Sequence, residues 1–158
     1  MFLCTLLLSA VVATATPAPT AANPAQLQFW VGEWDVLDNG RKVATTSIQS
    51  INDGRAILEN YAEPGYSGKS LTFVDGVLGK WRQVWVDTQG RVGEFAGEFK
   101  DGALHFTGET HTPDGRTIAR RLTLEPTADG GVHHYSEKSD DGGKTWVKAY
   151  DYIYAKRQ

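Results

Sequence analysis

The stretch that decides the fold reads Gly79-Lys80-Trp81-Arg82-Gln83-Val84-Trp85-Val86-Asp87. In an extended chain, successive side chains point to opposite sides, so Trp81, Gln83 and Trp85 share one face. Two large aromatic rings with an amide between them are typical of a pocket that has broad apolar walls and one polar group. The same pattern also suits a packed core in which the Gln83 amide finds a hydrogen-bond partner. The sequence leaves both interpretations open.

Outside this stretch, Gly and Pro interrupt a chain that is otherwise rich in Val, Ile, Thr and aromatic residues. No segment shows a sustained helical period, and only Ala25 to Trp30 suggests a short lead-in turn. Short strands separated by regular turn signals predict a sandwich or a barrel. The expected strands are 29–37, 41–50, 55–63, 70–74, 79–87, 91–99, 103–110, 116–124, 132–138 and 145–154. Short connections make chain neighbours sheet neighbours, and closure protects the two edges. We therefore expect an all-β, antiparallel up-and-down barrel of about ten strands.

The N-terminal segment has the pattern of an export signal. Residues 2–15 form an apolar run, and a stretch rich in Thr, Pro and Ala follows it. The run is shorter than the roughly 20 residues that span a bilayer, and small residues at 13–15 or 20–22 suit a cleavage site. No Lys or Arg precedes it, which is atypical. We expect residues 1–22 to be a signal peptide and linker, residues 23–158 to be a single barrel domain, and the protein to be secreted or periplasmic. The alternative is an apolar N-terminus on a cytoplasmic protein.

Charge and cysteine content narrow the classes of partner. The net charge is −3 and no block of basic residues occurs, which argues against nucleic acid and anionic membranes. No further stretch is apolar and long enough for a membrane span, so no stable membrane insertion is expected. The single cysteine, Cys4, lies in the signal segment, so the mature chain would have no disulfide and no cysteine nucleophile or metal ligand. The sequence gives no indication of the oligomeric state.

Turn chemistry predicts several strand registers. A two-residue turn at Asp101-Gly102 and three-residue loops at 88–90 and 113–115 set the pairs Trp81 with Gly97, Gln83 with Phe95, Phe95 with Gly108, and Arg120 with Gly108. Gly97 is expected to make room for an indole. The first hairpin is expected to pair Trp34 with Thr45, and a loop at 52–54 to pair Ser47 with Glu59, with Ile57, Glu59 and Tyr61 on the inner face. The loop before 132–138 is too long to fix a register, and one of its two registers brings Tyr135 and Glu137 onto the face of Arg120.

A charge inside the barrel requires a partner, and Arg120 with Glu59 or Glu137 is the natural pair. Three interpretations remain open: a structural ion pair, a polar anchor at the end of an aromatic cavity, and a catalytic carboxylate beside an arginine clamp.

The histidines give little indication of a metal site. His133 and His134 are adjacent on a strand and point to opposite faces, and no spacing resembles that of a zinc site. A haem with one axial histidine, His133 or His134, is the alternative to the expectation of no cofactor. Neither a serine nucleophile elbow nor a phosphate-binding glycine loop occurs, so no catalytic residue is assigned.

The segment from Ser139 to Trp146 matches the Asp-box pattern Ser-x-Asp-x-Gly-x-Thr-Trp of sialidase-like propellers. In those proteins the motif is a hairpin whose acidic side chain binds the turn backbone above a tucked tryptophan. A propeller repeats the motif in each blade, whereas this chain has one copy. The motif therefore predicts a stable hairpin and carries no indication of sialidase chemistry.

Gly32-Glu33-Trp34 resembles the Gly-x-Trp of lipocalins and related barrels, in which the tryptophan closes one barrel end. Together with 29–35, 58–60, 79–87 and 141–146, it makes the mature chain resemble a bacterial family of small exported barrels, known mainly as a domain of unknown function. The resemblance implies a lipocalin-like barrel and export, and it implies no activity and no catalytic residue. Tyr61 and Tyr135 stand where tryptophan is expected in relatives. The expected strand number and the lack of disulfides also depart from lipocalins proper.

These observations predict a barrel that binds a small, partly apolar molecule in its lumen. The expected ligand-binding residues are Glu59, Tyr61, Trp81, Gln83, Trp85, Phe95, Arg120, Tyr135 and Glu137. One alternative is a lumen hydrolase or isomerase in which Glu59 or Glu137 is the base and Arg120 holds an anionic intermediate. Another is a packed barrel that acts as an interaction module through its outer face or the loop at 63–69. The residues favour binding over catalysis without excluding an enzyme.

Overall fold

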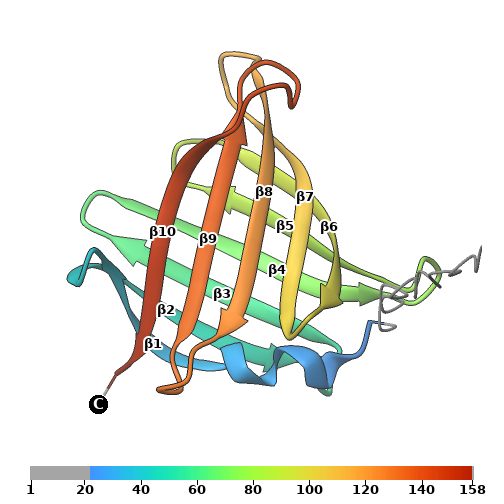
Figure 1. Cartoon of the computed structure of the whole chain (residues 1–158), viewed down its shortest axis with the longest axis vertical. Coiled ribbons are helices and arrows are strands. Elements are labelled where there is room, and N and C mark those ends of the chain that lie inside the picture. The colour runs from blue at the N-terminus through green and yellow to red at the C-terminus, as the bar shows by residue number, and fades with distance from the viewer. Residues whose placement is uncertain (1–21, 158) are drawn as a thin grey trace, which may run out of the picture.

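A computed structural model describes residues 22–157 and shows a closed barrel of ten antiparallel strands with one short 3-10 helix (Figure 1). The helix η1 spans Pro24–Trp30. The strands are β1 (Gly32–Asp38), β2 (Arg41–Ile51), β3 (Ala56–Glu63), β4 (Tyr66–Asp75), β5 (Lys80–Asp87), β6 (Val92–Lys100), β7 (Ala103–His111), β8 (Thr117–Pro126), β9 (Val132–Ser139) and β10 (Val147–Lys156). The expected all-β, up-and-down barrel is confirmed. The predicted signal peptide lies outside the described residues, except for Ala22.

Each strand pairs with its neighbours in the chain, and the first strand closes on the last. The closing pair runs from Trp34 opposite Lys156 to Asp38 opposite Tyr152. In Figure 1, β7 to β10 form the near wall and cross the strands of the far wall steeply. Closure leaves none of the ten described strands with a free edge for pairing with another chain.

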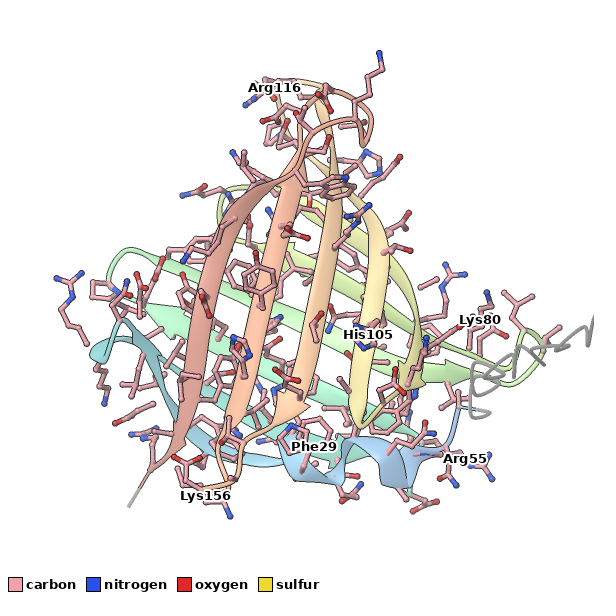
Figure 2. The ribbon with its side chains drawn as sticks, viewed as in Figure 1. Phe29, Arg55, Lys80, His105, Arg116 and Lys156 are labelled. Atoms are coloured by element: carbon pink, nitrogen blue, oxygen red, sulfur yellow. The ribbon has the colours of Figure 1, made fainter. Side chains whose placement is uncertain are left out.

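The helix η1 covers one end of the barrel. Asn23 starts it, because its Oδ1 accepts a hydrogen bond from the Ala25 amide at 3.0 Å and Pro24 occupies the first helical turn. Leu27 and Trp30 on this helix are completely buried. The Trp34 indole donates to the Trp30 carbonyl at 2.9 Å and fastens the helix to β1. Figure 2 shows Phe29 at this end and Arg116 at the opposite end.

Several predicted registers are confirmed. The structure pairs Trp81 with Gly97, Gln83 with Phe95, Phe95 with Gly108, and Gly108 with Arg120. Asp101 and Gly102 have φ values of 53° and 83°, as a type I′ turn requires. The missing side chain of Gly97 does make room for a ring, but the nearest ring is that of Phe106 and not the expected indole.

Two registers near the N-terminus are one residue away from those expected. A bulge between Val36 and Leu37 places Trp34 opposite Thr46 instead of Thr45. The next connection has four residues, 52–55, instead of three, so Glu59 faces Ile48 and not Ser47. The two changes compensate, and Glu59 and Tyr61 are buried inside the barrel as expected.

Strand β4 is longer than expected because Pro64 and Gly65 form a two-residue turn that pairs Glu63 with Tyr66. The helix found within residues 22–157, η1, is not long and apolar enough to cross a membrane.

Candidate functional site

The barrel encloses a cavity of about 560 Å³. It extends from the middle of the lumen toward the end opposite η1, where partly exposed side chains line it. The lining residues are Glu59, Tyr61, Glu63, Tyr66, Gln83, Trp85, Asp87, Arg91, Phe95, Thr110, Arg120, Leu122, His134, Lys138, Lys148, Ala149, Tyr150, Tyr152 and Tyr154. Its size lies within the range of roughly 300–1,000 Å³ that small-molecule sites occupy.

Aromatic rings form much of the cavity wall. Trp85 lies edge-on to Tyr61 with ring centroids 6.1 Å apart, and Tyr150 stacks on Tyr152 at 4.8 Å. Gly68 on β4 allows the Trp85 indole to lie flat against the strand, since a Cβ at Gly68 would come within 2.1 Å of the ring. Such walls offer a broad apolar surface to a ligand.

Glu59 lies at the inner end of the cavity and is 3% exposed. Its Oε2 accepts a hydrogen bond from Ser70 at 2.9 Å, and its Oε1 accepts from Thr46 at 3.3 Å and from Tyr154 at 3.5 Å. Burial raises the pKa of Glu59 to about 7, although these three hydroxyl groups lower it in part. The group therefore titrates close to neutral pH.

His134 connects Glu59 to a second tyrosine. Its Nδ1 lies 3.0 Å from the Tyr154 hydroxyl and its Nε2 lies 3.0 Å from the Tyr150 hydroxyl. Burial lowers the pKa of His134 to about 3, with a further contribution from the charge of Arg120, so the ring is neutral. Because Tyr154 donates to Glu59, it accepts from Nδ1–H, and Tyr150 then donates to Nε2. Three buried groups and the partly buried Tyr150 thus form one directed chain of hydrogen bonds that ends at Glu59.

Arg120 enters the cavity from β8, opposite Gly108, which has no side chain. Its guanidinium carbon lies 5.7 Å from the ring centroid of Tyr150. Its Nε is buried without a hydrogen-bond acceptor, and among residues 22–157 no carboxylate pairs with it. The expected ion pair of Arg120 with Glu59 or Glu137 is therefore not formed within the described chain.

A second arginine near the open end is fully paired. Arg91 Nε lies 2.7 Å from Asp87 Oδ2, and Asp87 also accepts from the Tyr66 hydroxyl at 3.1 Å. Although burial works against it, the hydrogen bonds from Arg91 lower the pKa of Asp87 below its ordinary value. These contacts hold the turn between β5 and β6 against β4.

Six of the nine residues expected at the site line the cavity: Glu59, Tyr61, Gln83, Trp85, Phe95 and Arg120. Whether they bind a ligand stays a prediction. Gln83 donates to Thr72 at 2.9 Å, so its amide already has one partner. Trp81 points inward but lies below the cavity, where it is 1% exposed and donates to Gln26 of η1 at 3.0 Å. It belongs to the core that closes the barrel end.

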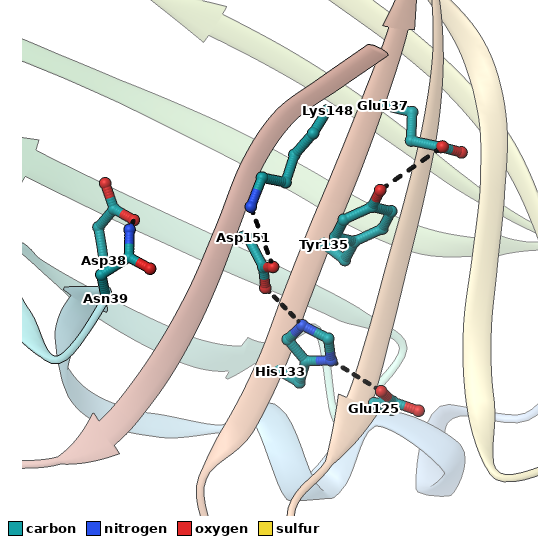
Figure 3. Close-up of polar contacts among 8 residues, drawn as sticks. All are labelled: Asp38, Asn39, Glu125, His133, Tyr135, Glu137, Lys148 and Asp151. Carbon is teal, nitrogen blue, oxygen red and sulfur yellow. Dashed lines mark hydrogen bonds and ion pairs between the residues drawn. The ribbon is translucent and has the colours of Figure 1, made fainter. Parts of the chain in front are cut away.

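Tyr135 and Glu137 lie outside the barrel. The pairing of β8 with β9 sets Arg120 opposite Lys138 and Leu124 opposite His134, which is the other of the two registers open from sequence. Figure 3 shows the hydrogen bond that the Tyr135 hydroxyl donates to Glu137, on the side of the sheet that also carries His133. A one-residue shift in this register moves every side chain of β9 to the opposite face.

The site residues missed from sequence are mainly His134, Tyr150, Tyr152 and Tyr154. The three tyrosines alternate along β10, and this period of two was a readable signal for a shared face. His134 required the correct register of β9.

The histidines take no part in a metal cluster. Across the described chain, no group of three or more His, Cys, Asp and Glu side chains is arranged to hold an ion. His133 bridges Glu125 and Asp151 on the outer face at 2.8 Å each (Figure 3), so it does not point inward. Both nitrogens of His134 bind tyrosine hydroxyls, which leaves neither one free as an axial haem ligand.

The Asp-box segment forms the predicted turn. Asp141 Oδ1 accepts from the amides of Lys144 at 3.0 Å and Thr145 at 2.9 Å, and the Trp146 indole donates to the Gly143 carbonyl at 3.0 Å. The prediction of a structural hairpin is confirmed in its contacts.

No protein-family model matches this chain, and no curated protein matches it at a significant level.

Proposed function

We propose that this barrel binds a small, partly apolar molecule in its lumen. The observation that carries the proposal is the cavity of about 560 Å³, which combines aromatic walls with polar and charged groups. This combination is typical of small-molecule sites. Trp85, Tyr61 and Phe95 would contact the apolar part of the ligand, and Gln83 and Arg120 would contact its polar part.

The hollow interior weighs against the alternative of a packed barrel that acts only through its outer face. An interaction module has no need for a space of this size, because close packing of a lumen stabilises a barrel. The cavity lining also includes charged groups, which a purely structural interior avoids.

A neutral fluorescent probe, N-phenylnaphthylamine, tests the proposal directly. Its emission rises when it enters an apolar site, so titration of the folded barrel gives a dissociation constant. Trp85→Ala removes a cavity wall and is expected to weaken binding about tenfold or more. Trp146→Ala removes an indole from the outer Asp-box turn and is the matched control. If the wild-type barrel does not bind the probe, or if both variants bind it equally, the proposal fails.

Native mass spectrometry of the barrel purified from its own host adds the identity of the ligand. A stoichiometric compound that is released on denaturation would support binding in the cell. The same measurement on Trp85→Ala is expected to show reduced occupancy, because the variant lacks a cavity wall.

We also propose that the barrel acts outside the cytoplasm, as its resemblance to a family of small exported barrels implies. The apolar run at 2–15 and the small residues that follow support this proposal. The mass of the protein recovered from the periplasm or medium tests it. The mass of a mature chain that begins at residue 16 or at residue 23 is expected, and a full-length cytoplasmic protein would contradict export.

Proton transfer in the lumen is a second candidate function. One observation favours it: Glu59 lines the cavity with a pKa of about 7 and ends a chain of hydrogen-bonded groups. A base with this pKa suits an isomerase or hydrolase at neutral pH. Glu137 lies on the outer face and is no longer a candidate base. The titration of the Glu59 carboxyl group can be followed by NMR. A midpoint near pH 4.5 would show that Glu59 has an ordinary pKa and would contradict its role as the base.

A further inference from the structure

Arg120 differs from the other cationic residues that line the cavity, because it has no carboxylate partner within residues 22–157. The others each contact one: Arg91 with Asp87 at 2.7 Å, Lys138 with Asp140 at 3.9 Å, and Lys148 with Asp151 at 3.5 Å. Arg120 is therefore the uncompensated positive charge of the lumen.

The surroundings of Arg120 make this lack of a partner costly. Its Nε is completely buried without an acceptor, and its guanidinium lies beside the Tyr150 ring, 5.7 Å from the ring centroid. Gly108, directly opposite on β7, contributes no side chain that could accept a hydrogen bond. Arg120 as a whole is partly buried, so its guanidinium has lost part of its solvation, and an anion in the cavity would restore favourable contacts.

Glu59 does not supply that anion. Its two oxygens are held by the hydroxyls of Thr46, Ser70 and Tyr154. Burial raises its pKa to about 7, so that near neutral pH it carries only part of a negative charge. The cavity thus contains an arginine whose hydrogen-bonding capacity is left for a ligand.

We infer that the cavity takes a small organic acid, whose carboxylate binds the Arg120 guanidinium and whose apolar body lies against Trp85, Tyr61 and Phe95. The inference rests on the proposed function and specifies the class of its ligand. A guanidinium presents parallel N–H donors that match the two oxygens of a carboxylate. The aromatic walls supply the apolar contact.

The first test compares two probes that differ in one group, naphthalene carboxylate and naphthalene carboxamide. Isothermal titration calorimetry on the wild-type protein is expected to show that the carboxylate binds about 10- to 100-fold more tightly. Equal affinities, or a tighter carboxamide, would overturn the inference. If N-phenylnaphthylamine still binds in that case, the proposed function stands while its anionic specificity falls. If none of the three probes binds, the proposed function itself fails.

The second test assigns the preference to Arg120. Arg120→Met is expected to lower the ratio of the two affinities to about one. Arg121→Met is the matched control, because the neighbouring side chain lies on the outer face, 3.8 Å from the ring centroid of Trp146. A preference for the carboxylate that survives in Arg120→Met would overturn the assignment. The wild-type comparison remains decisive if that variant does not fold.

Discussion

Glu59→Gln is expected to reduce the loss of folding stability that the barrel undergoes as the pH rises. The pKa of Glu59 is about 7 in the folded barrel and 4.5 for the ordinary group. Between these values the folded state holds a proton that the unfolded state has lost, so stability falls as the pH rises. A tenfold change in proton affinity corresponds to about 1.4 kcal/mol, so the loss amounts to about 3 kcal/mol once the pH exceeds 7. Glutamine resembles the protonated acid and does not titrate.

His134 produces the opposite dependence and must be separated from Glu59. Its pKa is about 3 in the folded barrel against an ordinary 6.5, so its contribution to stability is lost as the pH falls from 6.5 toward 3. The two slopes oppose each other between about pH 4.5 and 6.5, and the wild-type curve is expected to be nearly flat there. His134 is present in both Glu59→Gln and the wild type, so its contribution cancels when their free energies of unfolding are subtracted.

Urea unfolding, followed by tryptophan fluorescence at one-unit steps from about pH 4 to about pH 8, measures this difference. The free energy of unfolding of Glu59→Gln, minus that of the wild type, is expected to rise by about 3 kcal/mol across the range. Glu94→Gln removes an exposed carboxyl group from the outer face of β6 and is the matched control. A Glu59→Gln difference that stays constant with pH would refute the placement of Glu59 as a desolvated acid.

Three further substitutions, with Gly76→Ala as the control for the first, test other parts of the structure. Gly68→Ala should lower the free energy of unfolding by about 1–3 kcal/mol, because its Cβ would meet the Trp85 indole. Gly76→Ala has no atom within 4 Å of its Cβ and should be neutral in the same urea assay. His134→Leu removes the hydrogen bonds of its ring with the Tyr150 and Tyr154 hydroxyls, although Tyr154 keeps its bond to Glu59, and should cost about 1–3 kcal/mol at neutral pH; an unchanged stability would contradict the hydrogen-bond chain. Asp141→Asn should speed amide hydrogen exchange in its own turn without changing probe binding, and unchanged exchange would contradict the capping role.

Most of the barrel was predictable from turn residues. The pairs Asn39-Gly40 and Asp101-Gly102 adopt positive φ values at both positions, and Gly90 does so at the end of its three-residue loop. These conformations are unfavourable for most residues and accessible to Gly and Asn, so the positions of these turns can be predicted from the residue types. Once the turns are fixed, alternation along each strand decides which side chains enter the lumen.

The bulge in the first hairpin was not predictable in the same way. The register shifts between Val36 and Leu37, and the extra residue is Val43 of β2, a strand without glycine or proline in which the local sequence favours a regular ladder. The side chain of Val43 is partly buried and packs against the hydrophobic core, so tertiary packing accommodates the bulge. A packing contact of this kind leaves no turn residue in the sequence to mark the bulge.

The register of β9 was readable, although the length of its loop concealed the signal. Thr127-Ala128-Asp129-Gly130 repeats the pattern of Thr112-Pro113-Asp114-Gly115. In both, the threonine amide donates a hydrogen bond to the backbone carbonyl four residues later, at 3.0 Å. The threonine hydroxyl donates a hydrogen bond to the aspartate carboxylate. Treating the second loop like the first pairs Leu124 with His134, as in the structure. Local turn chemistry therefore does decide this register.

That single register determines the chemistry of the lumen. With Tyr135 and Glu137 inside, Arg120 would face a carboxylate, and the interior would be a closed ion pair. With His134 inside, the neutral ring joins Glu59 to the tyrosines of β10, and Arg120 is left without an anion. With Glu137 inside, the charge of Arg120 would be balanced within the protein. With His134 inside, the charge of Arg120 is available to an anionic ligand. The connection at 127–131, between β8 and β9, thus decides whether the lumen holds a closed ion pair or an arginine without an anion.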